Sequence, residues 1–298
     1  MERFDGTGVA LVTPFDEDLK IDEKSLRCLV EYVIEGGVDF LVVLGTTAES
    51  ATLSAEEKAR VVQVIAETNR GRLPMLAGIG GNNTAEVIRE IRQAEWLKSC
   101  QGILSIVPFY NKPTQSGLYE HFKALAEVTP LPLCLYNIPG RTGVNMEAET
   151  IARLSRECPR IFALKEASGS LEQATAILKQ KRSDMLVFSG DDAMVLPLMA
   201  LGFHGVISVV ANVMPRECSA LVEHMKAGRL AEARQLHLAL SEFCKLLFEE
   251  GNPAGVKAAL YAAGIIRHDN LRLPLTSVSE TLFRKIKQET EKKSDWRK

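Results

Sequence analysis

The sequence has few of the residue arrangements that metal and disulfide chemistry requires. It contains only five histidines in 298 residues, and its six cysteines lie far apart with no C-x-x-C pair. Reduced thiols packed as small apolar side chains explain these cysteines better than a disulfide framework or a zinc site. We therefore expect no bound metal. The six cysteines are Cys28, Cys100, Cys134, Cys158, Cys218 and Cys244.

The chain also lacks a marked excess of charge of either sign and any long hydrophobic run. It has 36 lysines and arginines against 38 aspartates and glutamates, which gives a formal net charge of −2. This balance argues against nucleic acid or an anionic membrane as a main partner. The apolar runs are too short to span a bilayer, and "MERFDGTGVALVTPFDED" has no cationic region followed by a long apolar stretch. We expect a soluble, cytoplasmic protein.

Short apolar segments rich in β-branched residues recur along the chain, with amphipathic segments between them. This alternation predicts βαβ units, and the nearly continuous apolar character of each short segment predicts a parallel sheet buried on both faces. No G-x-G-x-x-G follows the first segment, which favours a closed (β/α)₈ barrel over a doubly wound sheet. The predicted strands lie within residues 8–15, 40–45, 74–80, 102–108, 131–137, 161–168, 184–191 and 205–212.

The segments between the predicted strands carry signals of helix boundaries. Asp22 is placed to cap a helix over 23–35, and Ser54 with Glu57 forms a capping box ahead of the next helix. After the eighth strand the chain continues as predicted helix. We therefore expect a barrel over residues 1–225 and a helical C-terminal domain over 226–298.

One helix of this C-terminal region is predicted over residues 252–264, the stretch "NPAGVKAALYAAG". Asn252 is expected as its cap and Pro253 as its first helical residue.

Polar side chains follow most of the predicted strands, where a barrel enzyme carries its active site. They include hydroxyls, one lysine and one arginine, but no histidine. A catalytic triad or a zinc site is therefore not expected here, and "GIGGNN" lacks the lysine of a phosphate-binding loop. The strand-end residues are Thr13, Thr46, Thr47, Tyr110, Tyr136, Asn137, Arg141, Lys165, Ser208, Asn212 and the "SGDD" of strand seven.

Lys165 interrupts the apolar strand "IFALKEASG", where an unpaired ammonium would cost several kcal/mol if it were buried. Its side chain could extend into water from the strand end. Alternatively, the low dielectric of a barrel mouth favours a neutral amine, which can attack a ketone and form a Schiff base. Tyr136 could move protons through a threonine hydroxyl, and Arg141 offers a bidentate fork for a carboxylate. A strand-end aromatic and a solvated loop charge are the simpler readings of these two residues.

Five motifs, in this order and spacing, resemble those of the dihydrodipicolinate synthase family, which belongs to the pyruvate-dependent class I aldolases together with N-acetylneuraminate lyase. The likeness runs over essentially the whole chain. It implies a (β/α)₈ barrel with a C-terminal helical domain, usually assembled as a homotetramer. The motifs are "GTTAES", "VPFYNKP", "LYNIPGRTG", "LKEASG" and "GVISVVANV".

The resemblance implies that Lys165 forms a Schiff base with pyruvate, so that no separate cofactor is needed. It implies that Tyr136 moves protons and that Thr47 links it to Tyr110, which reaches into the site of a neighbouring subunit. Arg141 would hold the carboxylate of L-aspartate 4-semialdehyde, in a step of diaminopimelate and lysine biosynthesis. Other expected substrate-binding residues are Thr46 and Thr47 at the pyruvate carboxylate, and Gly190 and Ile207 in the lining of the site.

The chain departs from the family pattern at Ala48, where the motif usually has a second glycine. If this position requires a positive φ, alanine adds about 1 kcal/mol of strain.

A second departure concerns feedback inhibition by L-lysine. The residues that match lysine-sensitive members are Ser50, Ala51, Asn82 and Glu86. However, Ala55 and Lys58 stand where such members often have histidines, and Phe109 replaces a tyrosine. A lysine ligand would meet the charge of Lys58 and lose a hydroxyl at Phe109. We expect weak or absent inhibition.

Two rival functions remain open at this point. Another pyruvate aldolase, such as a sialic-acid or keto-deoxy-sugar lyase, is the nearer one, and Arg141 favours the synthase because the lyase branch typically lacks it. A barrel that binds keto acids without turning them over is the more distant rival.

Overall fold

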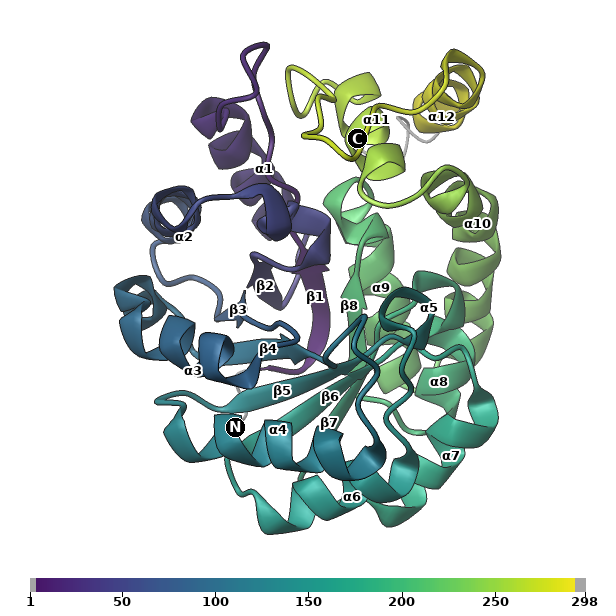
Figure 1. The fold of residues 1–298 in the computed structure, drawn as a ribbon. Helices are drawn as coiled ribbons and strands as arrows, with labels where there is room; N and C mark the ends of the chain where they lie inside the picture. Colours follow the sequence, from purple (N-terminus) through teal and green to yellow (C-terminus); the bar gives the residue numbers. More distant parts are fainter. Residues whose placement is uncertain (1–3, 293–298) are drawn as a thin grey trace.

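The protein, described here from a computed structural model that covers residues 4–292, is a closed barrel of eight parallel strands (Figure 1). The strands follow one another around the barrel in sequence order, and β8 pairs with β1 to close it. This confirms the predicted (β/α)₈ barrel. The strands are β1 Gly6–Ala10, β2 Phe40–Val43, β3 Met75–Gly78, β4 Gly102–Ile106, β5 Leu133–Asn137, β6 Ile161–Glu166, β7 Leu186–Ser189 and β8 Gly205–Ser208.

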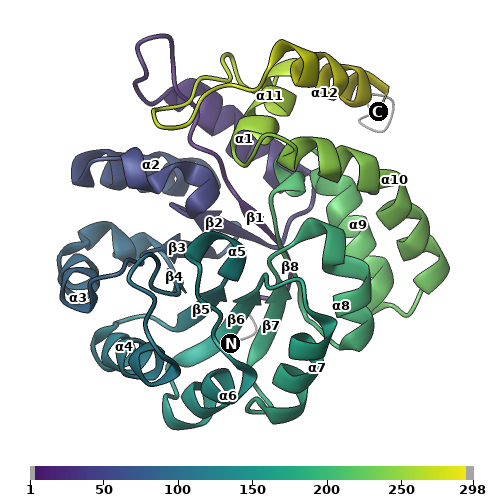
Figure 2. The same ribbon diagram turned by 45° about the vertical axis from the view of Figure 1, so that its right-hand side comes forward.

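The α-helices form a layer around the strands, and the last three lie beyond the eighth strand–helix unit (Figure 2). Of these three, α10 packs on α9, and α12 packs on both α11 and α10. The helices are α1 Glu23–Glu35, α2 Ala55–Asn69, α3 Thr84–Gln93, α4 Gln115–Val128, α5 Pro139–Thr142, α6 Ala148–Glu157, α7 Leu171–Gln180, α8 Val195–Leu201, α9 Pro215–Lys226, α10 Leu230–Phe248, α11 Ala254–Ala262 and α12 Glu280–Lys292.

The predicted division at residue 225 falls one residue before the end of α9. It stays a prediction, and residues 1–3 and 293–298 of the two predicted domains lie outside the part that the structure describes.

The interior of the barrel is filled with side chains rather than open. Phe4 lies 5.4 Å from both Phe40 and Phe162, measured between ring centroids. A packed interior leaves the carboxyl ends of the strands as the accessible end, where barrel enzymes hold substrates. The residues of this inner layer are Phe4, Ala10, Phe40, Val42, Leu76, Leu104, Cys134, Tyr136, Phe162, Ala163, Phe188 and Ile207.

The first two predicted helix starts are confirmed. The Asp22 side chain accepts a hydrogen bond from the backbone N–H of Ser25, and Ser54 and Glu57 make both bonds of a capping box. The third prediction is wrong. Pro253, not Asn252, is the cap residue of α11, and the side chain of Asn252 bonds to Thr47 instead. The carboxamide of Asn252 thus makes a contact 205 residues away rather than capping the helix that follows it.

All six cysteines have free thiols, and all except Cys28 are buried. Within residues 4–292, no helix is long and apolar enough to cross a bilayer. Over the same range, no group of three or more histidine, cysteine, aspartate or glutamate side chains is arranged to hold a metal ion.

Candidate active site

Lys165 and Tyr136 lie side by side on adjacent strands. They are paired in the register of β5 and β6, and the Nζ of Lys165 is 4.2 Å from the centroid of the Tyr136 ring. Only 5% of Lys165 and 6% of Tyr136 is exposed. Such burial does not fit a lysine that extends into solvent. Because the strand ladder fixes both backbones, the amine and the phenol have little freedom to move apart.

Gly190 leaves the space that Lys165 occupies. A Cβ built on Gly190 would lie 2.8 Å from the Cβ of Ala167 and 3.0 Å from the Cε of Lys165. A larger residue at this position would therefore press on the lysine stem. Ile207, on β8, is 1% exposed and belongs to the same inner apolar layer as Tyr136.

The loop after β2 carries the two threonines of "GTTAES" on a short 3₁₀ turn, Thr46–Ala48. Thr47 is buried, and its hydroxyl accepts a hydrogen bond of 3.0 Å from the Nδ2 of Asn252. Ala48 is not among the described residues with positive φ, so the strain expected there is absent. The left-handed residues of the loop are Leu44, at φ 55°, and Glu49, at φ 53°.

Arg141, on the short α5, lies between two cavities of about 530 Å³ each. Thr46, Tyr136 and Asn252 also line one of these cavities, and Gly190 lines the other. The guanidinium donates to the backbone oxygen of Asn252 at 3.2 Å. A carboxylate in either cavity would therefore have a cation within reach.

Tyr110 is not brought to the other predicted site residues within one chain. It lies in the loop between β4 and α4 with φ 71°, and 87% of it is exposed. Among the described residues no hydrogen bond joins Thr47 to Tyr110 or to Tyr136. The proposed hydroxyl relay would thus need a neighbouring subunit, a substrate or both.

The residues expected at a lysine-binding site are only partly together. Ser50 and Ala51 line the cavity that also contains Tyr136, beside Lys58 and Phe109. The ammonium of Lys58 forms a 2.7 Å ion pair with Glu90, so its charge is partly compensated.

The other two residues of this set, Asn82 just before α3 and Glu86 within it, do not line this cavity. The amide of Asn82 donates to the backbone oxygen of Phe109, and Glu86 forms an ion pair with Arg89. The carboxylate of Glu86 is therefore already engaged.

Sequence reasoning missed a buried polar network immediately behind the strand ends. Glu166 follows Lys165 in β6 and accepts hydrogen bonds from Asn137 and Gln173 and from the backbone N–H of Ser168. Burial raises the pKa of the Glu166 carboxyl, although these bonds oppose the shift. The available signal was a second charge in the same apolar strand, directly after Lys165.

Three of the strand-end residues named in the sequence analysis make structural contacts. Asn212 donates to the backbone oxygen of Ala10 and so joins β1 to the turn after β8. Thr13 donates to the backbone oxygen of Ala48 at 2.8 Å and supports the loop after β2. Asp191 caps the turn after β7 through its bond from the backbone of Ala193. Thr13 and Asn212 line neither of the two cavities, whereas Asp191 lines the one that also contains Gly190.

The fold and the site define a (β/α)₈-barrel protein with a buried lysine at the carboxyl end of its sixth strand. The chain belongs to the dihydrodipicolinate synthetase family, whose family model matches residues 3–293.

The chain is also similar to individual proteins over nearly its full length. The 4-hydroxy-tetrahydrodipicolinate synthase of Flavobacterium psychrophilum is 47% identical over 286 residues, which cover 96% of this chain and 97% of that protein. The crystal structure of dihydrodipicolinate synthase from Aquifex aeolicus is 40% identical with a TM-score of 0.93, covering 98% of each chain. The synthase from Cyanidioschyzon merolae, solved with lysine bound, is 39% identical with a TM-score of 0.92, covering 97% of each chain.

Proposed function

We propose that this protein is an aldolase-type lyase that condenses pyruvate with L-aspartate 4-semialdehyde, the activity of a 4-hydroxy-tetrahydrodipicolinate synthase. The observation that carries the proposal is the pair of buried side chains Lys165 and Tyr136, with the amine 4.2 Å from the ring centroid. Family membership and relatives near 47% identity support the same reaction.

In this reaction the neutral amine of Lys165 attacks the ketone carbon of pyruvate, and loss of water gives an imine. Loss of a methyl proton then gives an enamine, whose carbon attacks the aldehyde of the second substrate. The amine of that substrate displaces Lys165 and closes the ring. Each step moves a proton, and we assign this task to Tyr136, a buried tyrosine whose ring lies against the reacting nitrogen. The covalent lysine adduct takes the place of a separate cofactor.

Two carboxylates must be held in this scheme. We assign the pyruvate carboxylate to Thr46 and Thr47, and the carboxylate of the aldehyde to Arg141, which lines both cavities. Gly190 leaves room for the lysine stem, and Ile207 contributes to the apolar wall.

We propose further that the working form is a homotetramer in which Tyr110 completes the site of a neighbouring subunit. The exposure of Tyr110 in the single chain, together with its positive φ, supports a role in contact with a second copy. Analytical ultracentrifugation of the wild type, with the Tyr110→Ala variant as comparison, tests this. A monomer with full activity would contradict it.

L-lysine is proposed to inhibit weakly or not at all. Glu86 is engaged by Arg89, and Lys58 brings an ammonium to the cavity where a lysine ligand would carry its own. An inhibition constant in the micromolar range would overturn this proposal, whereas one far above it would support it.

The test of the reaction compares two substrates. Consumption of pyruvate should depend on L-aspartate 4-semialdehyde, and N-acetylneuraminate should not be cleaved. Arg141→Ala should raise the KM for the charged aldehyde by roughly 10- to 100-fold, the cost of a lost charge-assisted hydrogen bond. Cleavage of a neutral sugar acid without condensation activity would favour the rival lyase, and binding of pyruvate without turnover would favour the non-catalytic barrel.

A further inference from the structure

The loop between β2 and α2, residues 44–54, has a backbone that the strand ladder does not fix. The pairing of β2 with β3 ends at Val43. Beyond it, Leu44 and Glu49 both adopt the left-handed conformation that non-glycine residues rarely take. Such conformations persist only where the surroundings impose them. The loop carries Thr46 and Thr47, so whatever fixes it also places these two hydroxyls.

The carboxylate of Glu49 is held from both sides by the C-terminal part of the chain. One oxygen accepts a hydrogen bond of 2.5 Å from the Nζ of Lys257, and the other accepts one of 3.0 Å from the backbone N–H of Arg272. Both side chains of the Glu49–Lys257 pair are 0% exposed. Lys257 also donates to the backbone oxygen of Asn270 at 2.8 Å. With no solvent at either charge, each depends on the other for compensation.

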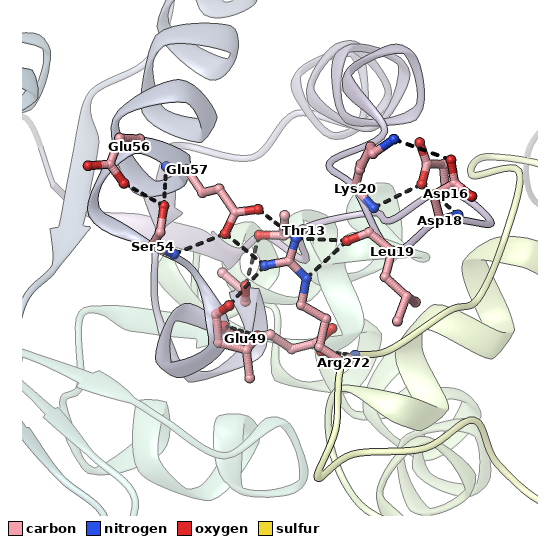
Figure 3. Close-up of polar contacts among 12 residues, drawn as sticks. Thr13, Asp16, Asp18, Leu19, Lys20, Glu49, Ser54, Glu56, Glu57 and Arg272 are labelled. Atoms are coloured by element: carbon pink, nitrogen blue, oxygen red, sulfur yellow. Dashed lines mark hydrogen bonds and ion pairs between the residues drawn. The ribbon is translucent and has the colours of Figure 1, made fainter.

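Arg272, also from the C-terminal part of the chain, contacts the end of the loop and the start of α2 (Figure 3). The guanidinium of Arg272 donates to the backbone oxygen of Thr52 at 2.8 Å, to that of Leu19 and to the carboxylate of Glu57. Figure 3 shows Arg272 between Leu19 on one side and Glu57 on the other. The start of α2 and the loop before it are therefore tied to one C-terminal side chain.

We call Asn252, Lys257 and Arg272 the C-terminal anchor. Asn252 bonds directly to the Thr47 hydroxyl. Lys257 and the backbone of Arg272 hold Glu49, whose own N–H donates to the backbone oxygen of Thr46 at 3.1 Å. The C-terminal part of the chain thus contacts Thr47 directly through Asn252, and it contacts Thr46 indirectly through Glu49.

We propose that Lys257 is a positioning residue for the reaction, acting through Glu49 to hold Thr46 and Thr47 where the pyruvate carboxylate binds. This inference rests on the proposed function, because it assigns the pyruvate carboxylate to these threonines. Lys257 lines neither cavity, and although Glu49 lines the cavity of Thr46, its side chain is 0% exposed and bonded to Lys257. Their loss should weaken pyruvate binding more than it weakens binding of the aldehyde, which Arg141 holds.

The experiment compares the double variant Glu49→Gln/Lys257→Met with the wild type. Replacing both charges avoids leaving one of them buried alone. The readouts are the KM values for the two substrates and the amide hydrogen exchange of residues 44–53. We expect the pyruvate KM to rise about tenfold, the effect of losing one charge-assisted bond, with the aldehyde KM unchanged and faster exchange in the loop.

The Asp22–Arg267 pair provides a matched control. Asp22 is also buried, and Arg267 bonds to it at 2.7 and 3.0 Å from the C-terminal segment. This pair joins the barrel to the same segment at the start of α1 rather than at the loop. Asp22→Asn/Arg267→Met should lower the melting temperature but leave the pyruvate KM and the exchange of residues 44–53 unchanged.

Two results would overturn the inference. One is a folded Glu49→Gln/Lys257→Met variant with the pyruvate KM and loop exchange of the wild type. The other is a control variant, Asp22→Asn/Arg267→Met, that changes the pyruvate KM and the loop exchange as strongly, which would indicate a general loss of contact between the barrel and the C-terminal segment. If the double variant does not fold, Glu49→Gln compared with the wild type near pH 9 serves, because burial lowers the pKa of Lys257 to about 8 and the lysine is then not left as an unpaired buried charge. Unchanged readouts there would contradict the inference equally.

The exchange measurement needs no turnover, and this separates the inference from the proposed function. A wild type that does not use pyruvate would overturn the function. Loop exchange in the variants would still decide whether Lys257 positions Thr46 and Thr47.

Discussion

Two lysines are buried among residues 4–292, and their surroundings differ. Lys257, in α11, is 0% exposed and bonded to the carboxylate of Glu49. Lys165, at the end of β6, is 5% exposed and faces the ring of Tyr136. Within the described part of the chain, no carboxylate is hydrogen-bonded to Lys165. A buried lysine bonded to a carboxylate is suited to a structural role. A buried lysine beside a tyrosine suits the nucleophilic role that we propose for Lys165.

The two lysines are also placed by different means. The backbone of Lys165 is fixed by pairing to Tyr136 on one side and Phe188 on the other. Lys257 instead reaches a loop 208 residues earlier in the chain. The position of a side chain on a strand is thus fixed mainly by the strand pairing. A side chain on a loop needs contacts from other parts of the chain to hold it in place. Four predictions test this comparison, from the largest expected effect to the smallest.

Exchanging each lysine for methionine should separate activity from stability. Lys165→Met should lower kcat by more than about a thousandfold, as loss of a covalent nucleophile does, without lowering the free energy of unfolding. Lys257→Met leaves Glu49 buried without its partner, so it should cost roughly 3 to 5 kcal/mol of stability. Steady-state kinetics and urea unfolding check both. A large loss of stability in Lys165→Met, with Lys257→Met unaffected, would reverse the comparison.

Tyr136→Phe keeps the ring beside Lys165 and removes only the hydroxyl. We expect kcat to fall by about 10²- to 10⁴-fold, the contribution of a positioned acid–base group. Pyruvate binding should change little because the ring remains. A variant with wild-type kcat would show that protons move by another route.

Gly190→Ala tests whether the fixed position of Lys165 matters. The added methyl would lie 2.8 Å from Ala167 and 3.0 Å from the lysine stem, so one of them must move. Overpacking of this kind costs about 1 to 3 kcal/mol of folding stability. If Lys165 is displaced as a result, kcat should fall roughly tenfold or more, because the reacting group is misplaced. Gly140→Ala, where an added Cβ meets nothing within 4 Å, is the matched control. Equal activity in the two variants would contradict the idea.

Acid should weaken the Asp22–Arg267 ion pair, which joins the barrel to the C-terminal segment. Burial tends to raise the pKa of Asp22, but bonds from Arg267 and Ser25 outweigh it and lower the pKa to about 2. A carboxyl with a lowered pKa stabilises the fold above its unfolded value of 3.8 and loses that contribution as pH falls toward 2. Because Arg267 is 56% exposed, the loss should be at most about 2 kcal/mol.

Urea unfolding of the wild type and Arg267→Met at pH 5 and pH 3 measures this loss. The two proteins should differ more at pH 5 than at pH 3. A constant difference would mean that Arg267 does not act through the charge of Asp22.

The barrel and the strand-borne half of the site could be predicted from the sequence because their signals are local. A parallel strand buried on both faces is a short apolar run, and a lysine that interrupts such a run stands out. The same signal exists at Lys257, the only charge within α11. However, a sequence does not say whether a buried lysine has a carboxylate partner. Glu49 lies 208 residues away, and Asn252, read as a helix cap, bonds to Thr47 at a separation of 205. Long-range contacts of this kind required the structure.

Borohydride trapping tests the central claim about the two lysines most directly. The protein is mixed with pyruvate, reduced, digested and analysed by mass spectrometry, with both lysine-containing peptides quantified. The account predicts a pyruvate adduct on the peptide that contains Lys165 and none on the peptide that contains Lys257. A folded protein without an adduct on Lys165, or with one on Lys257 instead, would contradict it.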